Sequence, residues 1–544
     1  MLAIEPGEKN QFELEGSKTY YSPDISFSVD KMWLEVEPDF ASKTIRGRQQ
    51  LKITTRQDLD KLELDSAGLT MESIYHSSAD FVMDENRFLI KNEKLDFDTE
   101  GEKLIIQLNK VYKEGSKFHL LINYNGKPER GFNFVKSYNG TSKQAWTQGE
   151  PEESKYWFPC LDHPQLKYPR EISVIVPEEF IVISNGELNI ADQADVQGKK
   201  KIKYVWEELN PNPTYLTCIV VGQFTETSRR ENYEGRVPLR YYVPKDRAKD
   251  ADRSFKDTEK MMRFFEGYFS TSYPFEKYSQ IVINDFPYGG MENTTCTTLY
   301  TDILHDEIAH IDYNSNDVVS HELAHQWFGD FITCRDWQHI WLNEGFATYC
   351  EALYIEHIYN TTPHEFQYYV LEMINGYLDE ATNLYKRPIV TKLYRDLDDL
   401  FDAHSYNKGG TVLHMLRHHV GEDDFKSSLK LYLDTFGNRT AESDDLRQIF
   451  EQVSGKSLQQ FFDQWVFRKG HPELNIDISV LDTNKLKIKV VQIQEEDAFV
   501  FPLEIKIVAS PVQENNGKRT YKRTCIKGSV LKEVNRSTEE LCKT

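Results

Sequence analysis

The pattern of apolar and polar positions changes twice along the chain. From about residue 46 to 224 apolar residues alternate with polar ones or form short runs between turns, as in 103–108, which predicts an antiparallel β-domain. From about 250 to 470 the apolar period approaches 3.6, which predicts a mainly helical region. After residue 471 alternation returns, as in 474–480, and indicates a β-sandwich of only about 75 residues. The clearest helical segments are 255–269, 317–328, 341–357, 408–419 and 458–467.

These patterns predict a multidomain α+β protein, and 544 residues is enough for about three or four domains. We place an N-terminal antiparallel β-domain at 1–222, a mainly helical domain at 223–470 and a short C-terminal β-sandwich at 471–544. The last domain is short enough to be an incomplete copy of its fold.

The net charge and the cysteine content indicate which kinds of binding partner and which cellular compartment to expect. With 87 acidic and 65 basic residues the net charge is −22, which repels nucleic acid and anionic membranes and attracts a protonated amine. The seven cysteines are scattered without a Cys-x-x-Cys pair, so a disulfide framework is not expected. Without a signal-like N-terminus or a long apolar segment, we expect a cytoplasmic protein. The oligomeric state is left open.

His321, Glu322 and His325 form the pattern His-Glu-x-x-His within a predicted helix. Histidines at i and i+4 lie one turn apart on the same face, so both imidazoles can bind one cation. Glu322 is rotated by about 100° from its neighbour, which suits it to act on a water molecule as a base and not as a ligand.

Catalytic zinc needs three protein ligands and an open water position, so the motif requires a third ligand nearby. Glu344 fits, because it follows His325 after eighteen residues near the start of the next predicted helix. Zinc is the expected metal, although His and Glu would also bind cobalt or manganese. His404 and the pair His418–His419 are interpreted as surface or packing residues, since adjacent histidines make a poor chelate.

These residues resemble the aminopeptidase N family of gluzincin zinc metallopeptidases. The spacing from His321 to Glu344 is that family's pattern, and the flanking segments 326–330 and 341–345 also match. A second block, 289–293, is similar to the family's exopeptidase motif, with Gly290 in place of the usual Ala. Further matches at 147–150, 156–162, 405–410 and 458–470 extend the resemblance over nearly the whole chain.

The resemblance implies a thermolysin-like catalytic domain and a role for each matching residue. Tyr406 would be the catalytic tyrosine that stabilises the developing oxyanion. Glu292 would bind the substrate amine, and Gln148 and Glu150 would help from the first domain. The backbone of Gly289, Gly290 and Met291 would align the peptide as an added strand. Asn293, the last residue of the exopeptidase motif, is also expected to bind substrate.

We therefore expect a zinc metallo-aminopeptidase, a hydrolase with one Zn²⁺ per chain, whose partners are peptides with a free N-terminus. His321, His325 and Glu344 would hold the metal, and Glu322 would be the general base. A non-catalytic scaffold subunit is one alternative, disfavoured because every expected site residue is present. An epoxide hydrolase of the leukotriene hydrolase branch is another, disfavoured by the strands after residue 470.

Many members of the aminopeptidase N family continue past the sandwich into a helical domain that covers the active-site cavity, whereas this sequence ends at Thr544. We expect a more open site with weaker discrimination against long peptides. An exposed sandwich edge could also bind a partner or a second copy. The preferred N-terminal residue does not follow from the sequence.

Overall fold

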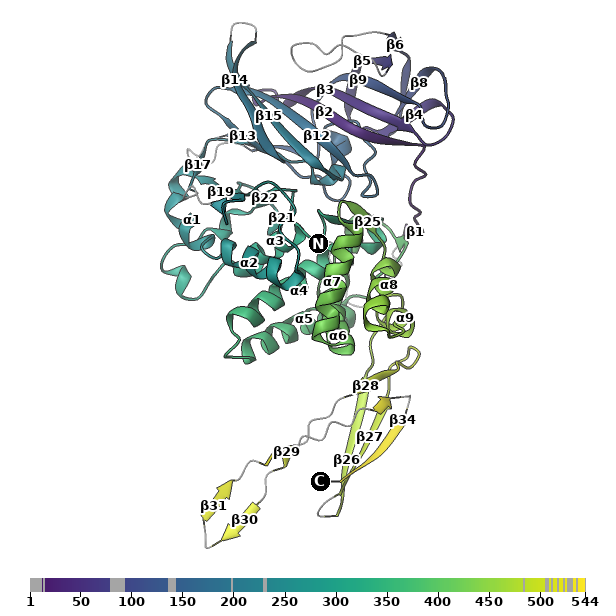
Figure 1. Ribbon diagram of the computed structural model, residues 1–544, viewed down its shortest axis with the longest axis vertical. Helices are drawn as coiled ribbons and strands as arrows, with labels where there is room; N and C mark the ends of the chain where they lie inside the picture. The colour runs from purple at the N-terminus through teal and green to yellow at the C-terminus, as the bar shows by residue number, and fades with distance from the viewer. Residues whose placement is uncertain are drawn as a thin grey trace.

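The computed structural model describes residues 12, 15–78, 93–135, 143–196, 199–227, 232–482 and 485–503, and also 508–509, 512–515, 518–521, 524–525, 532–534 and 537–543. Figure 1 shows three parts along the long axis: a β-rich N-terminal part, a helical central part and a small set of C-terminal strands. The predicted fold class, with a β-rich part, a helical part and C-terminal strands in that order, is confirmed.

The described residues of the N-terminal part form three sheets. The largest has eight strands in the order β14-β15-β12-β2-β3-β9-β5-β6. Their bounds are β2 Phe27–Asp39, β3 Thr44–Thr55, β5 Leu69–Ser78, β6 Glu93–Leu95, β9 Lys117–Gly126, β12 Tyr168–Pro177, β14 Glu187–Val196 and β15 Lys199–Asn212. The second sheet is β4 (Leu59–Asp65), β8 (Lys103–Tyr112) and β7 (Phe97–Glu100), and the third is β10 (Phe132–Val135), β11 (Gln144–Thr147), β16 (Ile219–Gly222) and β13 (Ile181–Ser184).

The alternation in the sequence explains these strands. In β2 the side chains of Met32, Leu34 and Val36 are fully buried while the residues between them are only partly buried, as expected for a sheet with one face on a core. The pairing is antiparallel except between β2 and β12, which run parallel. The expected antiparallel domain therefore contains one parallel pair, because β12 reaches β2 only after a long intervening chain.

In its described residues, the central part combines a mixed sheet with nine α-helices. The sheet has the order β17-β19-β20-β22-β21, with β18 paired to β19; the bounds are β17 Phe224–Glu226, β18 Asn232–Tyr233, β19 Val237–Pro244, β20 Tyr278–Val282, β21 Gly290–Met291 and β22 Cys296–Leu299. The helices are α1 Ala248–Ser254, α2 Thr258–Phe269, α3 Asn316–His325, α4 Trp341–Ile358, α5 His364–Asn383, α6 Gly409–Val420, α7 Glu422–Phe436, α8 Ser443–Ser454 and α9 Gln459–Trp465. Two short pairings complete it: β1 (Lys18–Thr19) with β24 (Leu393–Tyr394), and β23 (Ile332–Cys334) with β25 (Arg439–Ala441).

The predicted helices at 317–328 and 341–357 correspond to α3 and α4. The sheet of the central part was not predicted, because its strands are short and several are buried on both faces, which removes the alternation that a half-buried strand would show. This sheet matters for the site, since its edge strand β21 carries part of the exopeptidase-like block.

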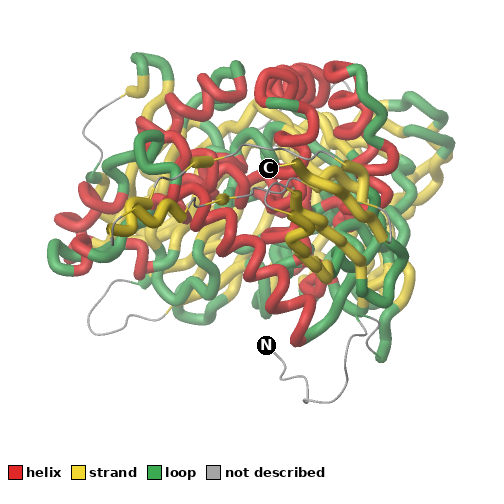
Figure 2. The backbone as a smooth tube through the Cα atoms, turned by 90° about the horizontal axis from the view of Figure 1, so that it is seen from below, coloured by secondary structure: helices red, strands yellow, loops and turns green. Residues whose placement is uncertain are grey.

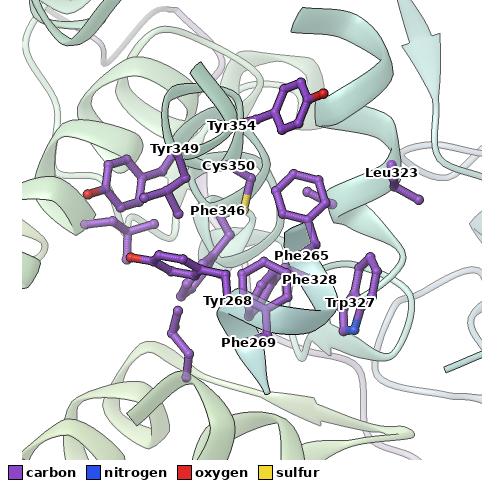
Figure 3. Packing of buried hydrophobic residues seen from close by; sticks show 14 of the residues in the cluster. Phe265, Tyr268, Phe269, Leu323, Trp327, Phe328, Phe346, Tyr349, Cys350 and Tyr354 are labelled. Carbon is purple, nitrogen blue, oxygen red and sulfur yellow. The ribbon is translucent and has the colours of Figure 1, made fainter. Parts of the chain in front are cut away.

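An aromatic cluster fixes α3 against α2 and α4, as Figure 3 shows. The rings of Phe328 and Phe346 stack with their centroids 4.3 Å apart, and Trp327 meets Phe265 and Phe269 edge to face. Burying one such ring contributes about 1.5–3 kcal/mol. The cluster therefore gives α3 and α4 a fixed relative position, on which any site shared between them depends.

The described C-terminal strands form one three-stranded sheet and three separate two-stranded pairs. The sheet is β26 (Leu474–Asp482), β27 (Lys485–Gln492) and β34 (Ser537–Lys543). The pairs are β28 (Phe501–Leu503) with β33 (Lys532–Val534), β29 (Val508–Ala509) with β32 (Thr524–Cys525), and β30 (Val512–Asn515) with β31 (Lys518–Tyr521). Figure 2, seen from below, places these strands in front of the helices.

The predicted strands after residue 471 are thus present, but among the described residues they pair as one three-stranded sheet and three separate pairs, and no second sheet of comparable size faces β26 to β34. Ile476 and Ile478 of β26 are accordingly exposed. The junction to the central part is made by Phe499, which is buried against Trp465 with ring centroids 5.0 Å apart.

The exact domain boundaries remain predictions. Among the helices in the described ranges, none is long and apolar enough to cross a membrane.

Candidate active site

Helices α3 and α4 bring His321, His325 and Glu344 together. The two Nε2 atoms of the histidines are 3.0 Å apart. Glu344 Oε2 lies 3.4 Å from His321 Nε2 and 3.3 Å from His325 Nε2. His325 and Glu344 are fully buried and His321 is partly buried, so the three donor atoms converge on one point away from bulk water.

This spacing fits a tetrahedral metal ion. Zinc with bonds of about 2.0–2.1 Å holds its ligands about 3.3 Å apart, which matches the separations of 3.0 to 3.4 Å among these atoms. Two imidazoles and a carboxylate are also the donor types of catalytic zinc sites. The residues present therefore fit the metal that the sequence predicts.

The outer nitrogen of each histidine has its own partner. His321 Nδ1 donates to Glu351 Oε1 at 2.7 Å, and His325 Nδ1 donates to the backbone oxygen of Phe328 at 3.0 Å. Such bonds fix the tautomer that leaves Nε2 free for a metal. Sequence reasoning missed Glu351, although it lies seven residues after Glu344 and hence two helical turns further along the same face of α4.

A cavity of about 690 Å³ adjoins the cluster, a volume typical of a ligand site. It contains five acidic side chains and one histidine along its wall, so its potential favours a cationic ligand. The lining residues are Gln148, Glu150, Pro151, Tyr288, Gly289, Gly290, Met291, Asp317, Val318, His321, Glu322, Glu351, Asp398, Phe401 and Tyr406.

Glu322 is buried beside the histidines and lines this cavity without taking part in the three-residue cluster. Burial raises the pKa of its carboxyl to about 8, against the opposing effect of His321 and His325. Gly290 leaves room for it, because a Cβ at that position would lie 2.2 Å from Glu322 Oε1. The usual Ala of the resembling family would therefore require this side chain to shift.

Glu150 and Glu292 meet from different parts of the fold. Their carboxylate oxygens lie within 4.8 Å of each other and of Glu344. Burial raises the pKa of both carboxyl groups. In the described part of the structure, Oε1 of each finds no hydrogen-bond partner. Two buried acceptors without donors form a site that a cationic group would satisfy.

The remaining residues predicted to bind substrate divide into two groups. Gly289, Gly290 and Met291 line the cavity, and β21 is an edge strand paired only with β22 in the central sheet. Gln148 lies beside them, its Nε2 donating to Met291 Sδ at 3.0 Å. Asn293 is fully buried and is not a lining residue; its Nδ2 donates to Thr298 Oγ1 at 3.3 Å. Its part in substrate binding stays a prediction.

Tyr406 reaches the site from a π-helical turn, His404–Lys408, labelled η8. Its ring lies nearly parallel to that of His321, with centroids 6.1 Å apart and an angle of 8°. Burial raises the pKa of the phenol well above its usual 10, and nearby carboxylates, Glu344 first, raise it further. The phenol is therefore neutral and can donate a hydrogen bond.

His404 is fully buried, so the packing interpretation holds for it and the surface one does not. Together with Glu380 and Asp402 it makes a second group of metal-ligand types. Its donor atoms are already engaged: Nδ1 donates to Glu380 at 2.7 Å, and Nε2 accepts from the backbone nitrogen of Arg387 at 3.2 Å. Arg387 also binds Asp402, so this group is an ion network and not a metal site.

Comparison with known proteins agrees with this geometry. Residues 253–465 match the peptidase family M1 domain, and residues 17–216 match the peptidase M1 N-terminal domain. Aminopeptidase M1 of Arabidopsis thaliana is 29% identical over 471 residues, which cover 83% of this chain and 51% of the relative. Probable aminopeptidase 1 of Saccharolobus solfataricus is 29% identical, covering 81% and 54% respectively. Glutamyl aminopeptidase of Rattus norvegicus is 31% identical over 342 residues, which cover 62% of this chain and 36% of the relative. The chain spans about half the length of the first two relatives.

Proposed function

The chain belongs to peptidase family M1, and from this premise we propose that it is a zinc-dependent aminopeptidase that removes single residues from the free N-terminus of peptides. One observation carries the proposal. The zinc-type ligands His321, His325 and Glu344 lie next to two acids, Glu150 and Glu292, whose Oε1 atoms accept no hydrogen bond within the described structure. The three ligands would bind the metal, and the two acids would bind an ammonium group.

His321, His325 and Glu344 would hold a zinc ion, which would supply Lewis-acid chemistry by lowering the pKa of water and polarising a peptide carbonyl. A cation held beside Glu322 would favour its carboxylate form, against the burial that raises its pKa. In that form Glu322 accepts the proton of the attacking water and then delivers it to the leaving amine. Its position on the cavity wall next to His321 supports this role.

Tyr406 donates its phenolic hydrogen to the carbonyl oxygen as negative charge develops there. The raised pKa of this phenol supports the role, because an ionised tyrosine would repel the same charge.

Glu150 and Glu292 bind the substrate's α-ammonium group, which restricts cleavage to the first residue. The edge strand β21, which lines the cavity, offers backbone groups to the peptide as an added strand. The acid-rich cavity attracts the amine and disfavours nucleic acid as a partner. A cytoplasmic location is kept as the working hypothesis.

Zinc content and hydrolysis of a panel of aminoacyl fluorogenic amides, each paired with its N-acetylated form, test the proposal. We expect one zinc per chain and cleavage of the free-amine forms alone. Glu322→Gln should keep the zinc and lose about 10²- to 10⁴-fold in kcat. The control is Glu307→Gln, since Glu307 is 88% exposed and outside the cavity. Zinc without hydrolysis of any amide would contradict the proposal and favour a scaffold role.

A further inference from the structure

A buried ion network holds the turn that carries Tyr406. Arg387, which is fully buried, lies at its centre. Its Nε donates to Asp402 Oδ2 at 2.8 Å, and its Nη2 donates to Asp402 and to Ser405 Oγ, the latter at 2.9 Å. The same guanidinium binds three backbone oxygens, those of Pro388 (2.8 Å), Ile389 (2.7 Å) and Leu400 (3.2 Å).

Asp402, which Arg387 holds, is itself hydrogen-bonded to the turn that carries Tyr406. Its Oδ1 accepts hydrogen bonds from the backbone nitrogens of His404 at 3.0 Å and Ser405 at 3.1 Å. Its backbone oxygen accepts from the nitrogen of Tyr406 at 3.1 Å. The side chain and the main chain of Asp402 thus cap the first turn of η8, in the way that an aspartate caps a helix.

Further contacts hold Asp402 in place. Tyr385 donates its hydroxyl hydrogen to Asp402 Oδ2 at 2.8 Å. Burial alone would raise the pKa of Asp402, but Arg387 and then His404 outweigh it and hold this pKa below its usual range. The carboxylate is therefore charged and able to accept all these bonds.

We propose that Arg387 is a positioning residue for Tyr406: its guanidinium fixes Asp402, and Asp402 fixes the π-helical turn that aims the phenol at the metal cluster. The kinetic part of this inference rests on the proposed function. None of the network residues lines the cavity, so Arg387 acts through Tyr406 and not on the substrate.

The geometry explains why arginine is needed. A lysine at position 387 would keep the charge but offers one nitrogen, which cannot bind Asp402, Ser405 and three backbone oxygens together. The turn would then lose part of its cap. A displacement of about 1 Å at a reacting group can lower the rate by about 100-fold.

Arg387→Lys tests the proposal by its kinetic signature. We expect kcat to fall about 10- to 100-fold with KM changed less than about threefold and zinc content unchanged, because the amine site and the metal ligands are untouched. In a Tyr406→Phe background the same substitution should have almost no further effect. Equal losses of kcat in both backgrounds would overturn the proposal, as would an unchanged kcat in the wild-type background.

A second test variant and a control variant complete the experiment. Tyr385→Phe removes only the 2.8 Å bond to Asp402 and should produce a smaller loss of the same kind if Arg387→Lys does not fold. Arg417→Lys is the matched control, since Arg417 lies in the last turn of α6, at the end away from η8, and pairs with Glu356 at 2.7 Å and with Glu422. It should lower stability without lowering kcat.

A measurement independent of activity separates this inference from the proposed function. With 3-fluorotyrosine at position 406, the ¹⁹F resonance should shift or broaden in Arg387→Lys and stay unchanged in Arg417→Lys. If the wild-type protein hydrolyses no amide, the proposed function fails and this resonance alone decides the positioning role. A resonance unchanged by Arg387→Lys would overturn that role.

Discussion

Adding a single methyl group at Gly149 should impair substrate recognition much more than it impairs folding. Gly149 is buried between Gln148 and Glu150, in the segment that carries these side chains from the N-terminal part into the cavity. Its backbone passes directly over Tyr215. A Cβ at position 149 would lie 2.2 Å from the backbone oxygen of Tyr215 and 2.7 Å from its Cα.

The size of the displacement follows from these distances. Ordinary van der Waals contact begins at 3.4 Å, so the gap must open by 3.4 − 2.2, or 1.2 Å. Tyr215 cannot give way easily, since its ring packs on Trp337 with centroids 5.2 Å apart and its hydroxyl accepts a bond from Asn343 at 3.1 Å. The shift therefore falls mainly on Glu150 and its neighbours.

We expect Gly149→Ala to lower kcat/KM for aminoacyl amides by about 10- to 100-fold, because a misplacement of about 1 Å has effects of that size. The loss should appear mainly as a higher KM, since Glu150 is proposed to bind the substrate amine. Overpacking should also reduce the free energy of unfolding by about 1–3 kcal/mol. Zinc content should not change, because the metal ligands lie on other elements.

Steady-state kinetics, zinc analysis and urea denaturation of the variant measure these three quantities. The control is Gly267→Ala in α2, where a Cβ would meet no atom within 4 Å. That substitution should stabilise the protein by about 0.5–1 kcal/mol and leave kcat/KM unchanged. If Gly149→Ala kept kcat/KM within twofold of the wild type, the link between this segment and amine recognition would be refuted.

Three further predictions concern the metal, the amine site and pH. Removing zinc with a chelator should lower the melting temperature and zinc should restore it, since an ion bound only by the folded state stabilises by about 4 kcal/mol at 1,000 times its Kd; an unchanged melting curve would argue against a bound metal. Glu292→Ala should lower kcat/KM for free-amine amides by about 10- to 100-fold through the loss of a charged hydrogen bond, and unchanged hydrolysis would exclude its amine-binding role. Burial lowers the pKa of His339 from 6.5 to about 4, so between these values the unfolded chain binds a proton that the fold does not. The unfolding free energy of the protein should therefore fall by up to about 3 kcal/mol as pH drops through that window. Urea denaturation at pH 7 and at pH 4.5 should show a smaller decrease in unfolding free energy for His339→Gln than for the wild type.

Much of the metal cluster could be predicted because its information is local. The i, i+4 spacing of His321 and His325 places them on one face wherever the segment is helical. The structure then needed only to bring α4 alongside α3, which the apolar faces of both helices favour. Glu351 was accessible to the same reasoning, since it shares a face with Glu344.

The amine site was assigned by resemblance and not by spacing. Glu150 and Glu292 are separated by more than a hundred residues and come from different parts of the fold. Nothing in either local pattern distinguishes them from solvated acids. Only the packing of the N-terminal part against the central part brings the two carboxylates together, with Oε1 of each accepting no hydrogen bond in the described structure.

The sequence by itself determined the order of strand-rich and helix-rich parts, the helices of the metal cluster and the candidate ligands, because backbone periodicity is a short-range property. The tertiary structure alone decided that the edge of β21 faces the cavity, that Arg387 anchors the turn of Tyr406, and how the described C-terminal strands pair. These features depend on contacts between residues far apart in the chain. Such contacts are fixed by which surfaces bury each other, and that is a property of the whole fold.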